Sequence, residues 1–317
     1  MRDAYGRSLS YLRVSVTQDC NLRCRYCVPQ GTSPVCGDGV LPFDDLVTLV
    51  RAFTACGVRK VRITGGEPLM RPGVVPFIEQ IAHLPGVREV DMTTNGLLLG
   101  RQARALADAG LSRVNVSLDS LSYRKYHDIT GGGRLSTVLD GIAAARSAGL
   151  LPVKVNTVLI KGFNDHEIND FIEFSHEQDV EVRFIELMPI GCGVSWSAER
   201  YVSAKEVLDA HPELVPAPGR DVSSTAACYR VPGKRAKIGF ITPMSCDFCA
   251  HCNRLRLSAR GRLRMCLHSK EEIDLTPGLA DSVALERLIM GAAVDKPRAH
   301  ALGQARYVET DMYQIGG

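Results

Sequence analysis

The chain has 317 residues, of which 45% are hydrophobic and 23% charged, with a formal net charge of +3. This composition is typical of a soluble globular protein with an ample core, in one large domain or two ordinary ones. No apolar run reaches the ~20 residues needed to cross a bilayer, and the first ten residues lack the apolar stretch of a signal peptide. We therefore expect a cytoplasmic protein. The net charge is too small for nucleic acid to be the main partner, so positive charge that matters must be local.

Short strands alternate with helices from residue 12 to about residue 188. The expected strands cover residues 12–16, 60–64, 89–95, 113–119, 153–159 and 182–188. Amphipathic helical stretches separate them, and those at 43–57 and 135–149 each end in a glycine that suits a helix C-terminus. Such alternation predicts a parallel sheet wrapped by helices. Six units predict an α/β fold of the partial (β/α)6, TIM-like barrel type.

The strand–helix rhythm ends after about residue 195. The remainder is rich in Pro, Gly, Arg and Cys, which indicates a smaller appended domain. We therefore expect a partial barrel over residues 1–195. Residues 196–317 are expected to form a C-terminal metal-binding domain that closes the barrel mouth.

The expected strands alternate polar and apolar residues, whereas parallel strands buried on both faces usually read as unbroken apolar runs. In residues 60–64, KVRIT, valine and isoleucine alternate with lysine, arginine and threonine. With a period of two, the apolar set faces the helices and the polar set faces inward. Arg, Lys and Asn are rarely buried without partners, so the interior is predicted to be a large, mainly cationic ligand cavity. The faces of residues 182–188 stay unassigned, because Arg183 is out of phase with Glu186 and Met188.

Seven of the eleven cysteines form two groups. The first group is Cys20, Cys24 and Cys27, and the second is Cys246, Cys249, Cys252 and Cys266. Disulfides are rare in the cytoplasm, whereas thiolates bind soft metals and iron–sulfur clusters. Four thiolates fill a metal site, but three leave one position open for chemistry. The alternative for the first group, a structural zinc knuckle, would need a fourth ligand, and no His or Cys follows before Cys36.

The stretch CNLRCRYC (20–27) resembles the signature of the radical S-adenosylmethionine (SAM) superfamily, and TGGEP (64–68) resembles its glycine-rich SAM motif. The resemblance implies that the first cysteine group binds three irons of a 4Fe–4S cluster whose fourth iron chelates SAM. It also implies that SAM is cleaved to a 5′-deoxyadenosyl radical. The SAM-contacting positions that match are Tyr26, Gly66, Ser117 and Met188.

The stretch FCAHCNRLRLSARGRLRMCL (248–267) resembles the C-terminal motif of the GTP 3′,8-cyclase family, and the likeness extends over nearly the whole chain. In that family three cysteines bind a second 4Fe–4S cluster whose open iron contacts the purine of GTP. The matching cysteines are Cys249, Cys252 and Cys266. Cys246 is an addition to this pattern, so a four-cysteine zinc site stays open. The matching GTP-contacting positions are Arg13, Arg62, Thr93, Lys154, Arg183, Arg254, Leu255 and Arg256.

The family resemblance implies a lyase that cyclises GTP to (8S)-3′,8-cyclo-7,8-dihydroguanosine 5′-triphosphate, the first step of molybdenum cofactor (molybdopterin) biosynthesis. The implied partners are GTP, a reductant for the cluster and a downstream cyclic pyranopterin monophosphate synthase; no nucleic acid or membrane is expected, and a homodimer is left open. No catalytic side chain is assigned. The terminal glycines, Gly316 and Gly317, resemble the family's ending, where the tail reaches the active-site cavity.

Two other functions remain open on the sequence alone. One is a radical SAM enzyme with an auxiliary cluster that acts on a peptide or another small molecule; it would not require the cationic strand faces. The other is a non-catalytic metal-binding module, which would explain the cysteines but not TGGEP.

Overall fold

The computed structural model describes residues 1–29, 31–32, 39–218, 224–245, 248–300 and 308–316. Its first part alternates strands and helices: β1 (Tyr11–Ser15), α1 (Phe43–Ala55), β2 (Lys60–Thr64), α2 (Val74–Ala82), β3 (Glu89–Thr94), α3 (Leu99–Asp108), β4 (Arg113–Ser117), α4 (Tyr123–Thr130), α5 (Leu135–Ser147), β5 (Lys154–Leu159), α6 (Ile168–Gln178) and β6 (Glu181–Glu186). The six expected strands are all present, and their bounds differ from the expected ones by at most two residues. None of the helices in these ranges is long and apolar enough to span a bilayer.

The second part mixes short strands and helices. Its elements are α7 (Gly193–Arg200), α8 (Ala204–Ala210), β7 (Val215–Pro216), β8 (Ala226–Arg230), β9 (Lys237–Ile241), β10 (Arg254–Leu257), β11 (Arg262–Arg264), β12 (Ile273–Asp274), α9 (Ser282–Val294) and α10 (Met312–Ile315). Short 3-10 turns lie at Pro68–Met70, Cys249–His251 and Thr276–Gly278. The boundary expected near residue 195 falls within α7.

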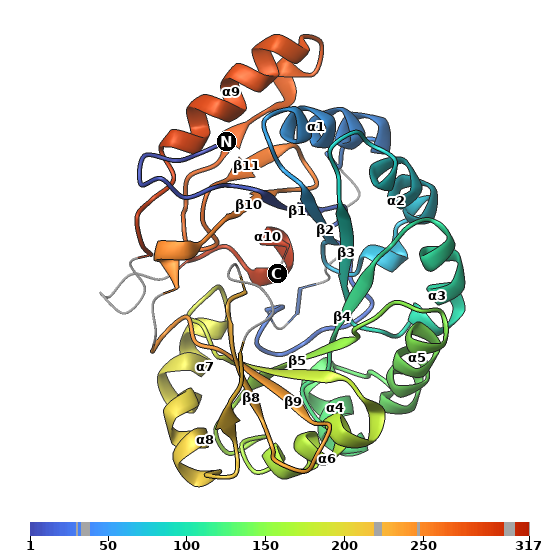
Figure 1. Cartoon of the computed structure of the whole chain (residues 1–317), viewed down its shortest axis with the longest axis vertical. Helices are drawn as coiled ribbons and strands as arrows, with labels where there is room; N and C mark the ends of the chain where they lie inside the picture. The colour runs from blue at the N-terminus through green and yellow to red at the C-terminus, as the bar shows by residue number, and fades with distance from the viewer. Residues whose placement is uncertain (30, 33–38, 219–223, 246–247, 301–307, 317) are drawn as a thin grey trace.

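One sheet joins all of these strands, in the order β12-β11-β10-β1-β2-β3-β4-β5-β6-β9-β8-β7. The stretch from β10 to β9 is parallel throughout, because β10 pairs with β1 and β9 pairs with β6 in the parallel sense. Figure 1 shows the sheet as an arc with helices on its outer side. Within the described chain its edge strands, β12 and β7, do not pair with each other. The expected α/β partial barrel is thus confirmed, and the C-terminal part extends it at both edges.

The apolar residues of the strands pack against the outer helices. Val61 and Ile63 of β2 are fully buried, in the same core as Phe53 of α1 and Ile78 of α2. Burying each such side chain contributes about 1.5–3 kcal/mol. Because this set points outward to the helices, the alternate residues of each strand are left to face the interior.

Alternate residues of strand β6 also face inward and outward, although polar residues stand on both of its faces. Arg183 lines the interior, whereas Glu186 is buried on the helix side. The carboxylate of Glu186 accepts hydrogen bonds from the main-chain N–H groups of Ala204 and Ser245 and from the Ser245 hydroxyl. These partners allow an acid to replace an apolar residue there, which is why alternation could not assign this strand.

The segment after residue 307 returns to the barrel. Val308 forms a parallel bridge with Ile190, and the main-chain N–H of Cys192 donates to Asp311 at 3.1 Å. Ile315 is buried beside Ile190 and Val308. In Figure 1, α10 and the C-terminus accordingly lie inside the arc of the sheet.

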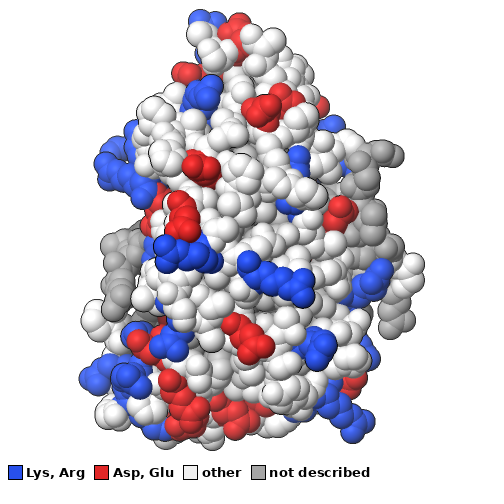
Figure 2. Space-filling view, turned by 90° about the vertical axis from the view of Figure 1, so that its right-hand side faces the viewer, with Lys and Arg blue, Asp and Glu red and all other residues white. Residues whose placement is uncertain are grey.

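One face of the outer surface, formed by the helices, carries mixed charge (Figure 2). Figure 2 shows the helical side of the molecule, on which Lys and Arg are interspersed with Asp and Glu. This distribution agrees with the small net charge of the chain. Cations are concentrated instead inside the sheet.

Candidate active site

The inner faces of the parallel strands enclose a cavity of about 700 Å³. Both cysteine groups contribute to its lining, as do the inner residues of every strand from β1 to β6. The lining Arg and Lys side chains are Arg13, Lys60, Arg62, Arg113, Lys154, Arg183, Arg230, Lys237, Arg254, Arg256 and Lys296. The only carboxylates among the described lining residues are Asp119 and Glu181. The mainly cationic cavity expected from the strand pattern is therefore present.

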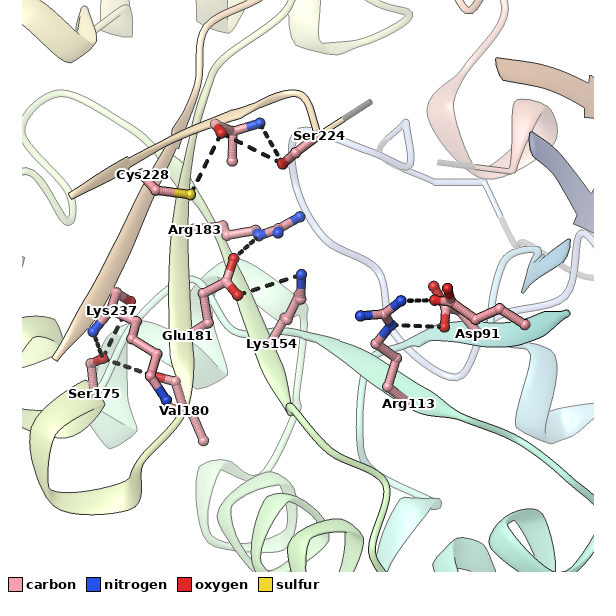
Figure 3. Close-up of polar contacts among 12 residues, drawn as sticks. Asp91, Arg113, Lys154, Ser175, Val180, Glu181, Arg183, Ser224, Cys228 and Lys237 are labelled. Atoms are coloured by element: carbon pink, nitrogen blue, oxygen red, sulfur yellow. Dashed lines mark hydrogen bonds and ion pairs between the residues drawn. The ribbon is translucent and has the colours of Figure 1, made fainter. Parts of the chain in front are cut away.

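Buried carboxylates hold several of these cations in place. Asp91 of β3 is fully buried and forms ion pairs with Lys60 at 2.9 Å, Arg62 at 2.6 Å and Arg113 at 3.1 Å. Glu181 lies between Lys154 and Arg183, at 3.4 and 2.6 Å. Figure 3 shows both arrangements, with Arg113 against Asp91 and the Glu181 carboxylate bridging its two partners. The acids fix the cations without neutralising the whole lining.

The crowding of charge changes the protonation of Lys154. Burial lowers the pKa of Lys154 to about 8, and the positive charge of Arg183 acts in the same direction against the effect of Glu181. At neutral pH the side chain is therefore mostly an ammonium, but it titrates far closer to neutrality than an ordinary lysine. Tyr11, at the floor of the cavity, has a lowered pKa because Arg62, Arg13 and Arg254 outweigh its burial.

The first cysteine group lies in the loop after β1, at the C-terminal end of the sheet where barrels build their active sites. This loop is tied to the turn after β2, because Gly66 donates to Thr17 at 2.8 Å and Glu67 donates to Asp19 at 2.7 Å. A Cβ added at Gly66 would lie 2.3 Å from the carbonyl oxygen of Asp19. The glycine motif thus serves first to let the turn pack against the cysteine loop.

The glutamate of the same motif is also buried. Its carboxylate accepts hydrogen bonds from the Thr94 hydroxyl at 2.8 Å and from the main-chain N–H of Asn95 at 2.7 Å. Burial raises the pKa of Glu67 to about 7. The contacts join the ends of β2 and β3 beside the cysteine loop.

The expected SAM-contacting residues all line the cavity near the first cysteine group. These residues are Tyr26, Gly66, Ser117 and Met188. The Tyr26 hydroxyl donates to Asp119 at 2.6 Å, and burial raises the pKa of Asp119 to about 6. Asp119 was not among the expected site residues; it follows directly on the polar face of β4, which was the available signal.

The second cysteine group lies beside β10. Cys249, Cys252 and Cys266 line the cavity, whereas Cys246 lies outside the described residues. Burial alone would raise the pKa of Cys252, but the charges of Lys296, Arg254 and Arg7 and a main-chain hydrogen bond lower it. An electropositive surrounding of this kind favours a thiolate.

Both described groups fit iron–sulfur clusters. Burial, with neighbouring thiols, raises the pKa of Cys24 and Cys27, so the first group needs a cationic partner to ionise. Each thiolate of a 4Fe–4S cluster binds a different iron, so the ligands need not converge on one point. In the described ranges, no three His, Cys, Asp or Glu side chains are grouped closely enough to hold a single metal ion.

The expected substrate-contacting residues fall into two sets: most line the cavity with their side chains, and one, Leu255, does not. Those whose side chains line the cavity are Arg13, Arg62, Thr93, Lys154, Arg183, Arg254 and Arg256. Leu255 instead packs in the hydrophobic core with no exposed surface, so any substrate contact there would come from its main chain. Lys60 and Arg113 also line the cavity, as the polar faces of their strands predict, although neither was assigned a substrate contact.

The terminal tail reaches the same cavity. The carbonyl oxygen of Gly316 accepts a hydrogen bond from Arg256 at 2.9 Å. A Cβ at Gly316 would lie 2.9 Å from Cβ of Ser15, and its φ of +77° favours glycine. The main-chain N–H of Tyr313 donates to the thiol of Cys27. Gly317 lies outside the described residues.

A family model described as the Radical SAM superfamily matches residues 14–175, and one described as Molybdenum Cofactor Synthesis C matches residues 180–302. Among solved structures, Streptococcus suis SuiB bound to S-adenosylmethionine is similar, with a TM-score of 0.66 at 14% identity. The alignment covers 92% of this chain and 66% of SuiB. The fold and the first cysteine loop thus define a radical SAM protein.

Relatives of similar sequence show to which family of radical SAM proteins the chain belongs. A GTP 3′,8-cyclase of Peptoclostridium acidaminophilum is 46% identical over 99% of this chain and 98% of its own. A GTP 3′,8-cyclase of Alkaliphilus oremlandii (strain OhILAs) is 44% identical over 100% of both chains. The chain belongs to the GTP 3′,8-cyclase family of the radical SAM superfamily. Membership implies a 4Fe–4S cluster and SAM as cofactors.

Gly66→Ala tests the packing of the cysteine loop. The added methyl group would meet the carbonyl oxygens of Asp19 and Gln18, so the loop must move and the first cluster should assemble poorly. Iron and sulfide counts on anaerobically reconstituted protein measure this loss. Gly291→Ala is the matched control, because a Cβ there would meet no described atom within 4 Å beyond its neighbours and the backbone of its own helix. Full iron content in Gly66→Ala would contradict the packing role.

Proposed function

We propose that the chain catalyses the conversion of GTP to (8S)-3′,8-cyclo-7,8-dihydroguanosine 5′-triphosphate, the first step of molybdenum cofactor biosynthesis. The observation that carries the proposal is a single cavity lined by two three-cysteine groups and by many Arg and Lys side chains. A triphosphate carries several negative charges, and arginine binds phosphate oxygens through two donors at once. A peptide substrate would not require this lining.

Cys20, Cys24 and Cys27 would hold the first cluster, with SAM at its open iron. When bound there, the cluster and SAM would supply the radical chemistry that removes a ribose hydrogen, at C3′ of GTP. Tyr26, Gly66, Ser117 and Met188 would orient SAM. The hydrogen bond from Tyr26 to Asp119 fixes the loop that carries the ligands against the end of β4.

Cyclisation joins C3′ of the ribose to C8 of the guanine in the same nucleotide. The protein's part is to hold base, ribose and triphosphate in one conformation, an effect worth about 7–11 kcal/mol at best. Arg13, Arg62, Thr93, Lys154 and Arg183 would bind the triphosphate and ribose from the strands. Arg254, Arg256 and the main chain of Leu255 would bind from β10, beside a second 4Fe–4S cluster on Cys249, Cys252 and Cys266.

The remaining proposals concern organisation and partners. Residues 1–195 would form the SAM-binding unit and residues 196–317 the auxiliary-cluster unit. We expect a cytoplasmic enzyme that receives electrons from a separate reductant. Its product would pass to a cyclic pyranopterin monophosphate synthase.

Anaerobic incubation with SAM, GTP and dithionite tests the reaction. The wild-type protein should produce 5′-deoxyadenosine and a cyclised guanine nucleotide. Cys24→Ser should abolish both products, whereas Cys252→Ser should keep the first cluster but lose cyclisation. Cys56→Ser, at a half-buried cysteine outside the cavity lining, is the control. 5′-Deoxyadenosine without any GTP-derived product from the wild type would favour a different substrate, and wild-type cyclisation by Cys252→Ser would reject the second group's role.

GTP binding should depend on the protonation of Lys154. A phosphate stabilises the ammonium, so affinity is full below the free pKa of about 8 and falls as the pH rises beyond it. The fall should approach about tenfold per pH unit, one proton being linked to binding. Equilibrium dialysis of GTP between neutral and alkaline pH measures it. Lys154→Arg should bind GTP without this fall, and a flat wild-type profile would show that Lys154 does not contact phosphate.

The tail should matter for cyclisation but not for cluster assembly. Gly316 contacts Arg256, Ser15 and Thr64, so removing Gly316 and Gly317 frees Arg256 and opens the cavity beside β1 and β2. The truncated protein should retain wild-type iron content and lose most cyclisation. Cyclisation at the full rate would mean that the tail does not shape the pocket.

A further inference from the structure

Two buried cations, Arg7 and Lys296, contact the main chain of the segments that carry the second cysteine group. Arg7 is 8% exposed and Lys296 is 2% exposed. Neither belongs to a strand of the sheet, and neither is among the residues assigned to GTP in the function proposed above. Burying a cation is costly unless it is well partnered, so their contacts indicate what they are for.

Arg7 is held on one side by Asp3, which pairs with its Nε. On the other side its two terminal nitrogens donate to carbonyl oxygens. Nη1 donates to Cys249 at 2.8 Å and to Arg298 at 3.0 Å. Nη2 donates to Pro297 at 2.7 Å and to Lys296 at 3.2 Å. One guanidinium thus joins the start of the chain, the first cysteine of the second group and the segment that carries Lys296.

Lys296 completes the connection. Its Nζ donates to the carbonyl oxygen of Arg254 at 2.8 Å and to that of Met265 at 2.5 Å. Arg254 stands two residues after Cys252, and Met265 directly precedes Cys266. Arg7 and Lys296 together therefore bind the main chain at or beside all three cysteines of the group.

Among the described residues, no carboxylate forms an ion pair with Lys296. Burial lowers the pKa of Lys296, and the charges of Arg7 and Arg256 act in the same direction, whereas the thiols of Cys252 and Cys266 oppose this by favouring the ammonium. Thiolate-ligated iron–sulfur clusters carry negative charge, and nearby charge and hydrogen bonds set their reduction potentials.

We propose that Lys296 is a positioning residue of the second cluster: with Arg7 it fixes the three cysteine segments, and its ammonium makes that cluster easier to reduce than a neutral side chain would. This inference rests on the second cluster of the proposed function. The energetic part follows from Coulomb attraction, which favours the more negative, reduced cluster beside a cation in a low-dielectric site. The geometric part follows from the hydrogen bonds of both cations to the cysteine segments.

The charge is tested by Lys296→Gln, which removes it, and Lys296→Arg, which keeps it. Lys205→Gln is the control, because Lys205 is exposed and pairs with Asp209, one helical turn along the chain. Holoenzyme is titrated with dithionite and followed by electron paramagnetic resonance, and a Cys24→Ser background identifies the signals of the second cluster. In Lys296→Gln the second cluster should shift to a more negative midpoint potential, while the first cluster stays unchanged. Lys296→Arg and Lys205→Gln should match the wild type.

The positioning role of the hydrogen bonds is tested separately by Arg7→Lys, which keeps the positive charge but loses the several N–H donors of the guanidinium. It should lower iron occupancy at the second site and leave the first site loaded. If Lys296→Gln also loses only second-site iron and Lys296→Arg restores it, positioning is supported. An unchanged potential in a fully loaded Lys296→Gln protein would overturn the proposal, and so would equal loss of iron from both sites.

The iron count of the wild type separates this inference from the proposed function. About eight irons per chain indicate two clusters, in which case unaffected variants count against the role of Lys296 and Arg7 alone. About four irons would instead refute the second cluster, and the proposal with it.

Discussion

Repulsion among like charges is the constraint on which the interior depends. Arg and Lys outnumber carboxylates along the cavity, and bringing so many like charges close together is unfavourable. Asp91 and Glu181 relieve part of the repulsion and hold their partners in fixed positions. The excess that remains is offset when a polyanion binds. Binding of such a ligand therefore also stabilises the folded chain, since the unfolded chain has no comparable site.

The strand pattern predicted most of this interior. Alternation with a period of two correctly predicted that Arg62 and Lys154 face inward, because helices cover the other face of each strand. It failed at β6, where Glu186 stands on the helix side and is satisfied by Ala204 and Ser245. Local periodicity records which residues are polar, but not whether a polar residue has found partners within the core.

Other features depend on contacts between residues far apart in the chain. Arg7 reaches the carbonyl of Cys249 across 242 residues, and no local pattern indicates such a pair. The role of Asp91 is equally hidden, since its three partners come from two neighbouring strands. Cysteine spacing could predict the two thiol groups because ligands of one group are close in sequence, except Cys266. The reason for Gly66 also needed the structure, which shows the carbonyl of Asp19 where a side chain would be.

The order of strands has a consequence for synthesis of the protein. β1, near the start of the chain, pairs on one side with β10, and β6 pairs with β9. Both partners are made after β6, so a nascent chain with six finished strands has two unpaired parallel edges. Its cationic interior also faces water until residues 237–257 emerge. Such long-range pairing slows folding, and exposed strand edges invite association with other chains. The sheet is therefore completed after translation of its C-terminal strands, and Cys249 and Cys252 of the second group come shortly before β10, the strand that pairs with β1.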